Sequence, residues 1–94
     1  KDMYLQADTH KLIIQENEIY LTKTENVIMK QLLLSPKQVV TKTKLLEALS
    51  IESTIECDEN SLKVHISNIR KKIKKLTDTE YIESVWGNGF KIHE

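Results

Sequence analysis

Residues 61–76 read SLKVHISNIRKKIKKL, and this stretch decides the fold. Its apolar residues recur at spacings of four, three, four and three, at Leu62, Ile66, Ile69, Ile73 and Leu76. At about 100° per residue they form a stripe roughly 80° wide, which is the pattern of a helix with one buried edge. The opposite side is polar except for Val64. A negative charge at Asp58 or Glu59 favours the helix start, and the lysines gather toward its end, as the helix dipole prefers.

Charge is strongly polarised along the chain, although the total is zero, with fourteen basic and fourteen acidic residues. Residues 61–76 contain no acid and six basic side chains, Lys63, Arg70, Lys71, Lys72, Lys74 and Lys75. Residues 52–59, ESTIECDE, contain four acids and no base. Such local polarity indicates a partner of opposite charge for each segment, and a nucleic acid for the basic one.

The chain before this helix predicts a small sheet and two further helices. MYLQ, KLIIQ and EIYL are short strand-like runs separated by the polar segments ADTH and EN. Thr22 and Glu25 form a capping-box pattern, so a first helix begins near Lys23, and Pro36 ends it at Ser35. Its apolar face is Val27, Ile28, Met29, Leu32 and Leu33. QVV is an extended connector, after which Thr41 caps a second helix that packs Leu45, Leu46 and Leu49 inward.

The closing stretch SVWGNGFKI, residues 84–92, holds both glycines and the only tryptophan. It predicts a hairpin that turns at Gly87, Asn88 and Gly89, both glycines supplying unusual backbone angles. Trp86 has two interpretations. It folds onto the domain and braces the hairpin, which we favour because tryptophan is usually well buried, or its indole packs across a sugar-phosphate ridge while Asn88 or Lys91 makes the polar contact.

These elements predict one α+β domain over residues 1–94, a winged helix-turn-helix. Its parts are an N-terminal antiparallel sheet at 1–22, a three-helix core at 23–76 and a hairpin wing at 77–94. A single cysteine excludes a disulfide scaffold, and no apolar run reaches the ~20 residues of a membrane span, so we expect a cytoplasmic protein without a membrane partner. The first residues, KDMYLQ, lack an initiator methionine, which suggests a domain of something longer.

The face of the third helix opposite the stripe is suited to the DNA major groove. Candidate base readers are Asn60, Ser61, Val64, Ser67, Asn68 and Lys71. Candidate phosphate contacts are Lys63, Arg70, Lys74 and Lys75 on this helix and Thr41, Lys42 and Lys44 at the start of the second. The plain alternative is a solvated helix face, which is the usual fate of charged residues on an amphipathic helix.

Three motifs in the right order resemble the winged-helix output domain of OmpR/PhoB-type response regulators. LTKTE, LKVHISNIRKKI and SVWGNGF match the family features L-T-x-x-E, V-D-V-H-I-x-x-L-R-x-K-L and T-V-R-G-x-G-Y, and the match covers nearly the whole chain. The resemblance implies a bacterial DNA-binding transcription regulator that follows a phosphoacceptor receiver domain and dimerises on tandem half-sites.

The resemblance also assigns residues. It places Asn60, Ser61, Val64, Ser67, Asn68 and Arg70 at positions the family uses on DNA, His65 at a phosphate-contacting position, and Ser84 at the threonine of the wing base. It assigns the loop SIESTIECD, with Glu52, Glu56 and Asp58, to RNA polymerase. The chain departs from the family where Trp86 replaces a common wing arginine, and where Asn60, Ser67 and Asn68 replace basic residues, so base preference does not transfer.

Other chemistries find little support. Cys57, His65, His10 and His93 do not form a tetrahedral zinc pattern, and the acids near Cys57 should raise its pKa. There is no nucleophile elbow, calcium loop or glycine-rich phosphate loop, so we expect no enzyme, metal or cofactor. The runner-up function is a winged-helix module that binds protein through the acidic residues 52–59.

Overall fold

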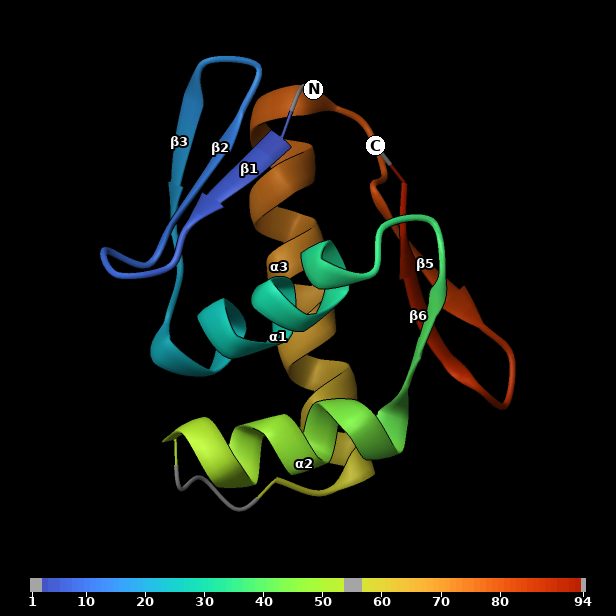
Figure 1. Cartoon of the computed structure of the whole chain (residues 1–94). Coiled ribbons are helices and arrows are strands. Elements are labelled where there is room, and N and C mark those ends of the chain that lie inside the picture. The colour runs from blue at the N-terminus through green and yellow to red at the C-terminus, as the bar shows by residue number, and fades with distance from the viewer. Residues whose placement is uncertain (1–2, 54–56, 94) are drawn as a thin grey trace.

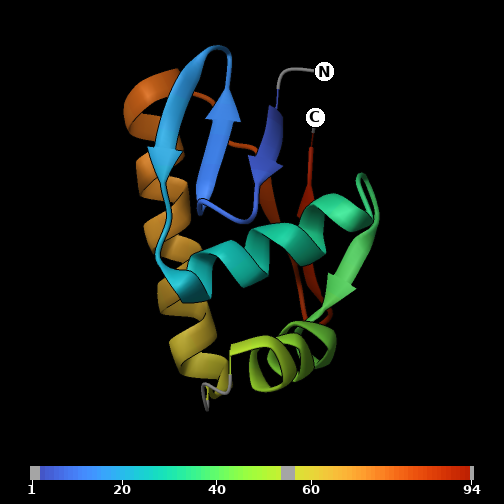
Figure 2. The same cartoon turned by 60° about the vertical axis from the view of Figure 1, so that its left-hand side comes forward.

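The computed structural model describes residues 3–53 and 57–93 and is a winged helix flanked by two sheets (Figure 1). In chain order the elements are β1 (Met3–Gln6), β2 (Lys11–Ile14), β3 (Asn17–Tyr20), α1 (Lys23–Leu34), β4 (Val39–Thr41), α2 (Lys42–Ser53), α3 (Glu59–Thr77), β5 (Ile82–Val85) and β6 (Gly89–Ile92). Figure 2 shows α1 between the N-terminal sheet and α2, with α3 along one side and the C-terminal sheet along the other. The predicted fold class is confirmed.

The N-terminal sheet is an antiparallel meander in the order β1-β2-β3. Its side chains alternate as a half-buried sheet requires, with Met3, Leu12, Ile14 and Ile19 in the core and Tyr4 and Tyr20 exposed. Ile14 pairs with Asn17, so Gln15 and Glu16 alone make the second turn, both at positive φ (50° and 71°). That is the type I′ geometry of a tight hairpin, here built without the usual asparagine or glycine.

The start and end of α1 are where the sequence places them. Thr22 accepts from the backbone N–H of Glu25 at 3.1 Å, and Glu25 accepts from the backbone N–H of Thr22 at 3.0 Å. The helix ends at Leu34, with Ser35 as its C-cap before Pro36. It buries Val27, Ile28, Met29 and Leu32, so its predicted apolar face is confirmed.

The segment predicted as a connector is a strand. Val40 of β4 pairs with Phe90 of β6, and the C-terminal sheet therefore has the order β4-β6-β5. Short segments such as QVV become strands only when a distant partner lies beside them, which local sequence does not show. Thr41 ends this strand and caps α2, accepting from the backbone N–H of Lys44 at 3.1 Å as predicted.

Helix α3 packs its apolar stripe into the core as predicted, except at its end. Asp58 caps it by accepting from the backbone N–H of Ser61 at 2.8 Å. Leu62, Ile66, Ile69 and Ile73 are buried, but Leu76 is 48% exposed, so its assignment to the buried stripe is wrong. Leu76 lies in the last turn of α3, one residue before the helix ends at Thr77, so it stands at the end of the buried stripe.

The two glycines of the wing serve different needs. Gly87 has a φ of +75° in a turn closed by the Asn88 N–H donating to the Val85 carbonyl at 3.0 Å. Gly89 has no positive φ, which corrects the expectation that both supply unusual angles. A β-carbon on Gly89 would lie 2.1 Å from the Val40 carbonyl oxygen, so glycine is required there by the close approach of β4.

This difference separates two otherwise similar substitutions. We expect Gly89→Ala to lower the free energy of unfolding by roughly 2 kcal/mol or more, because β4 must move away from β6. Gly87→Ala has open space around it and should cost about 1 kcal/mol, which is the strain of a left-handed backbone alone. Urea denaturation of the two variants measures this, and equal losses would show that β4 does not constrain Gly89.

Candidate nucleic-acid interface

The outward face of α3 presents most of the predicted contact residues together. Its exposed side chains are Asn60, Ser61, Lys63, Val64, Asn68, Lys71, Lys74 and Lys75, with His65 and Ser67 half-buried. Val64 is 57% exposed, opposite the buried stripe. No acidic side chain belongs to this face beyond Glu59 in the first turn. The face is therefore accessible, basic and polar, as a groove-binding helix requires.

Lys72 is separate from the other basic residues of α3. Its ammonium lies 2.6 Å from Glu25 Oε1 and donates to the Tyr20 carbonyl at 3.2 Å. The Glu25 side chain is only 2% exposed and also accepts from the backbone N–H of Thr22. Lys72 thus completes the partners of a buried carboxylate and joins α3 to the start of α1, which makes it a structural residue within the basic run.

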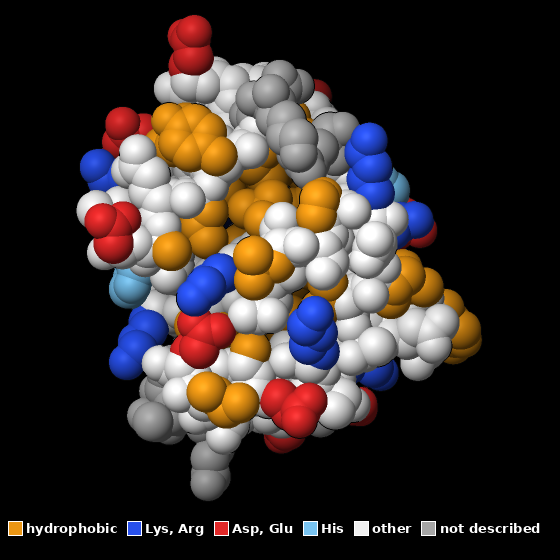
Figure 3. All heavy atoms as spheres, viewed as in Figure 1, with side chains coloured by type: hydrophobic (Ala, Val, Ile, Leu, Met, Phe, Trp, Pro, Cys, Tyr) orange, Lys and Arg blue, Asp and Glu red, His pale blue; other side chains and the backbone are white. Residues whose placement is uncertain are grey.

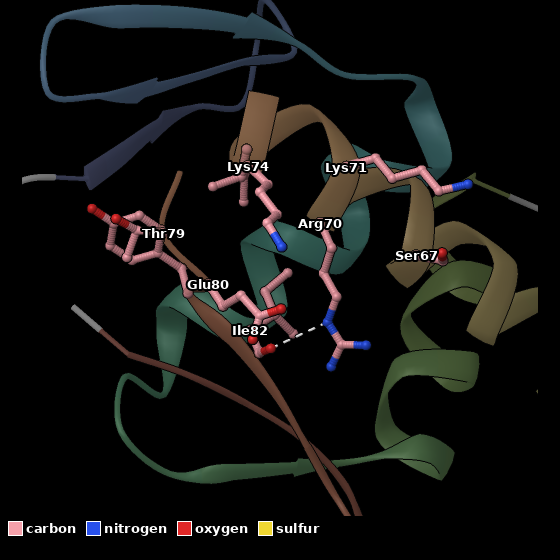
Figure 4. Close-up of a pocket in the computed structure, with 9 residues that line it drawn as sticks. Ser67, Arg70, Lys71, Lys74, Thr79, Glu80 and Ile82 are labelled. Atoms are coloured by element: carbon pink, nitrogen blue, oxygen red, sulfur yellow. Dashed lines mark hydrogen bonds between the residues drawn. The ribbon is translucent and has the colours of Figure 1, made fainter. Parts of the chain in front are cut away.

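Arg70 is hydrogen-bonded to the wing, so its predicted contact with a DNA phosphate would come from a side chain already anchored within the domain. Its Nε donates to the Ile82 carbonyl at 3.2 Å and its Nη2 donates to Ser84 Oγ at 2.7 Å. Figure 4 shows the guanidinium reaching from α3 to β5, with Lys74 pointing toward the same side and Lys71 pointing away from it. Nothing in the local sequence indicates this contact, because Ser84 meets Arg70 only when the wing folds back along α3.

A hollow of about 530 Å³ lies between α3 and the wing, beside the start of α2. Its polar lining comes from three elements and consists of Lys42, Lys63, Arg70 and Ser84. The backbone N–H of Lys42 donates to the Asn88 carbonyl at 3.3 Å, and its ammonium lies 3.6 Å from Glu59 Oε1. The structure therefore brings Lys42, Lys63 and Ser84 together, and Lys44 is exposed in the same first turn of α2.

Trp86 does not pack on the domain, so the favoured interpretation of this residue is wrong. Its side chain is 96% exposed at the tip of the wing. Hydrophobic side chains stand out from the body at the position of the wing in Figure 3. Trp86 is exposed because it is the first residue after β5 and lies in the turn that joins β5 to β6. Asn88 is exposed beside it, whereas Lys91 is half-buried and sits opposite Glu83, away from the tip.

The acidic segment is less free than its sequence suggests. Helix α2 extends to Ser53, so Glu52 belongs to the helix and not to a loop. Its carboxylate accepts from Lys30 and from Gln31 of α1, each at 3.0 Å. Asp58 caps α3, and the hydrogen bonds from Ser61 hold the pKa of its carboxyl below the usual value. Glu56 lies outside the described residues.

Residues 3–53 and 57–93 hold no candidate metal centre. No cluster of three or more histidine, cysteine or acidic side chains there can hold a metal ion. Burial and the neighbouring Asp58 raise the pKa of Cys57, in the predicted direction, which leaves it a weak nucleophile. The smaller hollow of Figure 4, lined by Ser67, Lys71 and Lys74, is open to the surface. Among residues 3–53 and 57–93, no helix is both long and apolar enough to cross a membrane.

Known proteins with similar sequences are bacterial regulators. A family profile described as "Transcriptional regulatory protein, C terminal" matches residues 16–92. The chain is 35% identical over 90 residues to the response regulator protein GraR of Staphylococcus haemolyticus, covering 94% of this chain and 40% of GraR. It is 30% identical to GraR of Staphylococcus saprophyticus, of which it covers 41%. The chain thus spans about two fifths of the length of these relatives.

Solved structures share the fold. The C-terminal domain of the nisin resistance regulator NsrR superposes with a TM-score of 0.83 at 38% identity, covering 99% of this chain and 93% of that one. The DNA-binding domain of the response regulator AdeR, in complex with an intercistronic region, gives a TM-score of 0.84 at 24% identity, covering 100% and 96%. Both likenesses agree with a winged helix that has an N-terminal sheet.

Measurements of stability can test whether Lys72, unlike the other lysines of α3, has a structural role. Lys72→Met should lower the free energy of unfolding by roughly 1 to 3 kcal/mol, because the buried Glu25 carboxylate loses its charged partner. Lys71→Met is the matched control, since Lys71 is exposed and its loss should change stability by less than about 0.5 kcal/mol. Urea denaturation compares them, and equal stabilities would show that the Lys72 pair contributes nothing.

Proposed function

Because this chain belongs to the family of C-terminal domains of transcriptional regulatory proteins, we propose that it binds double-stranded DNA sequence-specifically, with α3 in the major groove and the β5–β6 wing near the minor groove. The family comprises DNA-binding domains of transcription regulators and not enzymes, and the resemblance to OmpR/PhoB-type response regulators is confirmed. One observation carries the proposal: α3 buries its apolar edge and leaves a basic, polar face accessible beside the wing.

Roles on DNA follow from position along α3. The residues opposite the core are the proposed base readers: Asn60, Ser61, Val64, Ser67, Asn68 and Lys71. Asparagine pairs with adenine through two hydrogen bonds, and a valine methyl suits the methyl of thymine. The proposed phosphate contacts are Thr41, Lys42, Lys44, Lys63, His65, Lys74, Lys75 and Ser84. These residues surround the base readers on α2, α3 and the wing, where the phosphates along the edges of the groove would lie.

Arg70 has a different proposed role from the one its sequence position suggests. Two of its nitrogens already bond to β5, so the side chain fixes the wing relative to α3. The remaining guanidinium hydrogens and the Ser84 hydroxyl stay available for one phosphate. The contact of Arg70 with DNA therefore depends on the wing being in place.

The whole protein is proposed to be a two-component response regulator. Residues 1–94 would form one output domain, with the sheet at 1–22, the helices at 23–76 and the wing at 77–94, under control of a phosphoacceptor receiver domain. We propose a homodimer on tandem half-sites and contact with RNA polymerase near Glu52, Glu56 and Asp58. Glu52 already pairs with Lys30 and Asp58 already caps α3, so a protein that binds there, in this function or in the protein-binding alternative, would compete with contacts inside the domain.

Salt dependence tests the groove-facing role of α3. Each phosphate neutralised adds about −0.9 to the slope of log K against log salt concentration. Lys74→Met, which removes a proposed phosphate contact, should therefore reduce that slope by about 0.9, while Lys72→Met, measured well below its unfolding temperature, should leave it unchanged. Fluorescence polarisation with a labelled random-sequence duplex gives both slopes, and the same loss in both variants would contradict the orientation of α3.

Base preference tests the reading face. Asn68→Ala should relax discrimination at one base pair by roughly 1 to 3 kcal/mol, whereas Lys75→Ala should weaken binding to all sequences alike. The measurement is selection of bound fragments from a random duplex pool, followed by titration of single-base variants. An unaltered preference in Asn68→Ala would remove this residue from the base readers.

A further inference from the structure

We propose that the hollow between α3 and the wing is a binding site for a small organic anion, a flat apolar ring system that bears one carboxylate or sulfonate group. The ring lies against Val85 and Trp86 in this arrangement, and the anionic group meets Lys63 and Arg70. The ligand site goes beyond the proposed binding of DNA and is tested in the absence of DNA.

The hollow has the size of a small-molecule site and walls that belong to the fold. Its volume of about 530 Å³ lies within the range of roughly 300–1,000 Å³ that is typical of ligand pockets. Ile66 and Phe90 are part of its lining and are core residues, 1% and 5% exposed. The wing side is tied to α2, because the backbone N–H of Lys42 donates to the Asn88 carbonyl at 3.3 Å. A ligand therefore finds a hollow whose walls are already built.

One part of the lining is apolar and suits a flat ring. Val85 is half-buried and Trp86 is 96% exposed, and both line the hollow. A ring stacked with an offset on an indole covers apolar surface of both partners and adds the attraction between two aromatic systems. Bare phosphate or sulfate has no surface to offer these side chains. The apolar lining therefore favours a ligand with an apolar body.

The charged part of the lining is positive. Lys42, Lys63 and Arg70 line the hollow, and none of the described residues that line it is acidic. A cleft whose charges have one sign concentrates ions of the opposite sign. Arg70 is held in place by its two hydrogen bonds to β5, so its charge is fixed at the wall. The Lys42 ammonium already lies 3.6 Å from Glu59 Oε1, so we assign the anionic group to Lys63 and Arg70.

Lys63 makes this positive charge a feature of this chain. In LKVHISNIRKKI, Lys63 stands where the family feature V-D-V-H-I has aspartate. Residues seven apart lie on the same face of a helix, so the side chain at position 63 is on the face of Arg70, two turns away. An aspartate there would offset one positive charge of the hollow, whereas lysine adds a second cation on the same face. The exchange of aspartate for lysine therefore favours an anion in this hollow.

Naphthalenesulfonate is a probe with this chemistry, and the only tryptophan of the chain reports where it binds. During titration of the isotope-labelled chain, the indole N–H signal of Trp86 should shift and saturate, with a dissociation constant on the order of 0.1–1 mM for a ligand of this size. Naphthalenesulfonamide keeps the ring without the charge, and sulfate keeps the charge without the ring. Each of these two should bind at least about fivefold more weakly than naphthalenesulfonate.

Two variants, each with a matched control, separate the charged contact from the ring contact. Lys63→Asp should weaken the binding of naphthalenesulfonate roughly tenfold, whereas Lys23→Asp makes the same change of charge at an exposed residue of α1 outside the hollow and should not. Trp86→Ala should weaken it roughly fivefold, whereas Ile51→Ala removes an exposed apolar side chain of α2 outside the hollow and should not. The backbone amide signal of Gly87 follows binding where the indole is absent, and urea denaturation checks that each variant is folded.

Three results would overturn the site. The first is an indole signal that naphthalenesulfonate does not move. The second is an equal loss of affinity in Lys63→Asp and Lys23→Asp, which would mean that the probe responds only to the total charge. The third is sulfate binding as tightly as naphthalenesulfonate, which would mean that the ring contributes nothing. DNA is absent from all of these titrations, so the proposed function does not affect their outcome.

A competition experiment then relates the ligand to the proposed function. Lys63 and Ser84 are also proposed phosphate contacts, so naphthalenesulfonate at ten times its dissociation constant should weaken the binding of a labelled random-sequence duplex several-fold. Sodium chloride at the same ionic strength is the control for screening. If the duplex binds without displacing the probe, the proposed position of DNA beside the wing is wrong and the ligand site stands. If the chain binds the probe but no duplex, the proposed function fails and the ligand site again stands.

Discussion

The contact between Lys72 and Glu25 sets the orientation on which the rest of the structure depends. Glu25 is a buried carboxylate at the start of α1, and Lys72 is the cation of α3 that meets it at 2.6 Å. The pair fixes how α3 is turned about its own axis, together with the buried stripe at Leu62, Ile66 and Ile69. A helix fixed at this rotation presents Asn68 and Lys71 outward, so the ion pair and the buried stripe together determine which side chains of α3 are exposed.

A second set of contacts joins the parts of the interface into one rigid unit. Arg70 ties α3 to β5, and the backbone of Lys42 ties α2 to the wing tip at Asn88. Helix α3, the start of α2 and the wing are therefore joined by contacts within the domain itself. Pre-organisation of this kind reduces the entropy lost on binding and lets a small domain of zero net charge use a locally basic surface. The zero net charge conceals this surface because the acids lie elsewhere in the domain. Asp58 caps α3, and Glu25 and Glu52 pair with lysines.

Several features of the fold and the site could be predicted from the sequence because they depend on neighbours along the chain. The Thr22 capping box, the Pro36 boundary, the stripe of α3 and the outward position of Val64 all follow from local spacing. The same spacing misplaced Leu76, since a helical period says where a residue points and not how far the covering elements extend. The hairpin at Gly87 was recognisable from its glycines, but the reason for Gly89 was not.

The sequence by itself determined the family, the order of the elements and the basic face, since periodicity, caps and motifs are written in adjacent residues. Only the tertiary structure decided which members of that face are free. It assigned Lys72 to Glu25, Arg70 to Ser84, Glu52 to Lys30 and QVV to a strand beside β6, because each of these partners lies far away in the chain. It also left Trp86 exposed, since burial depends on which elements fold over a residue and not on its neighbours along the chain.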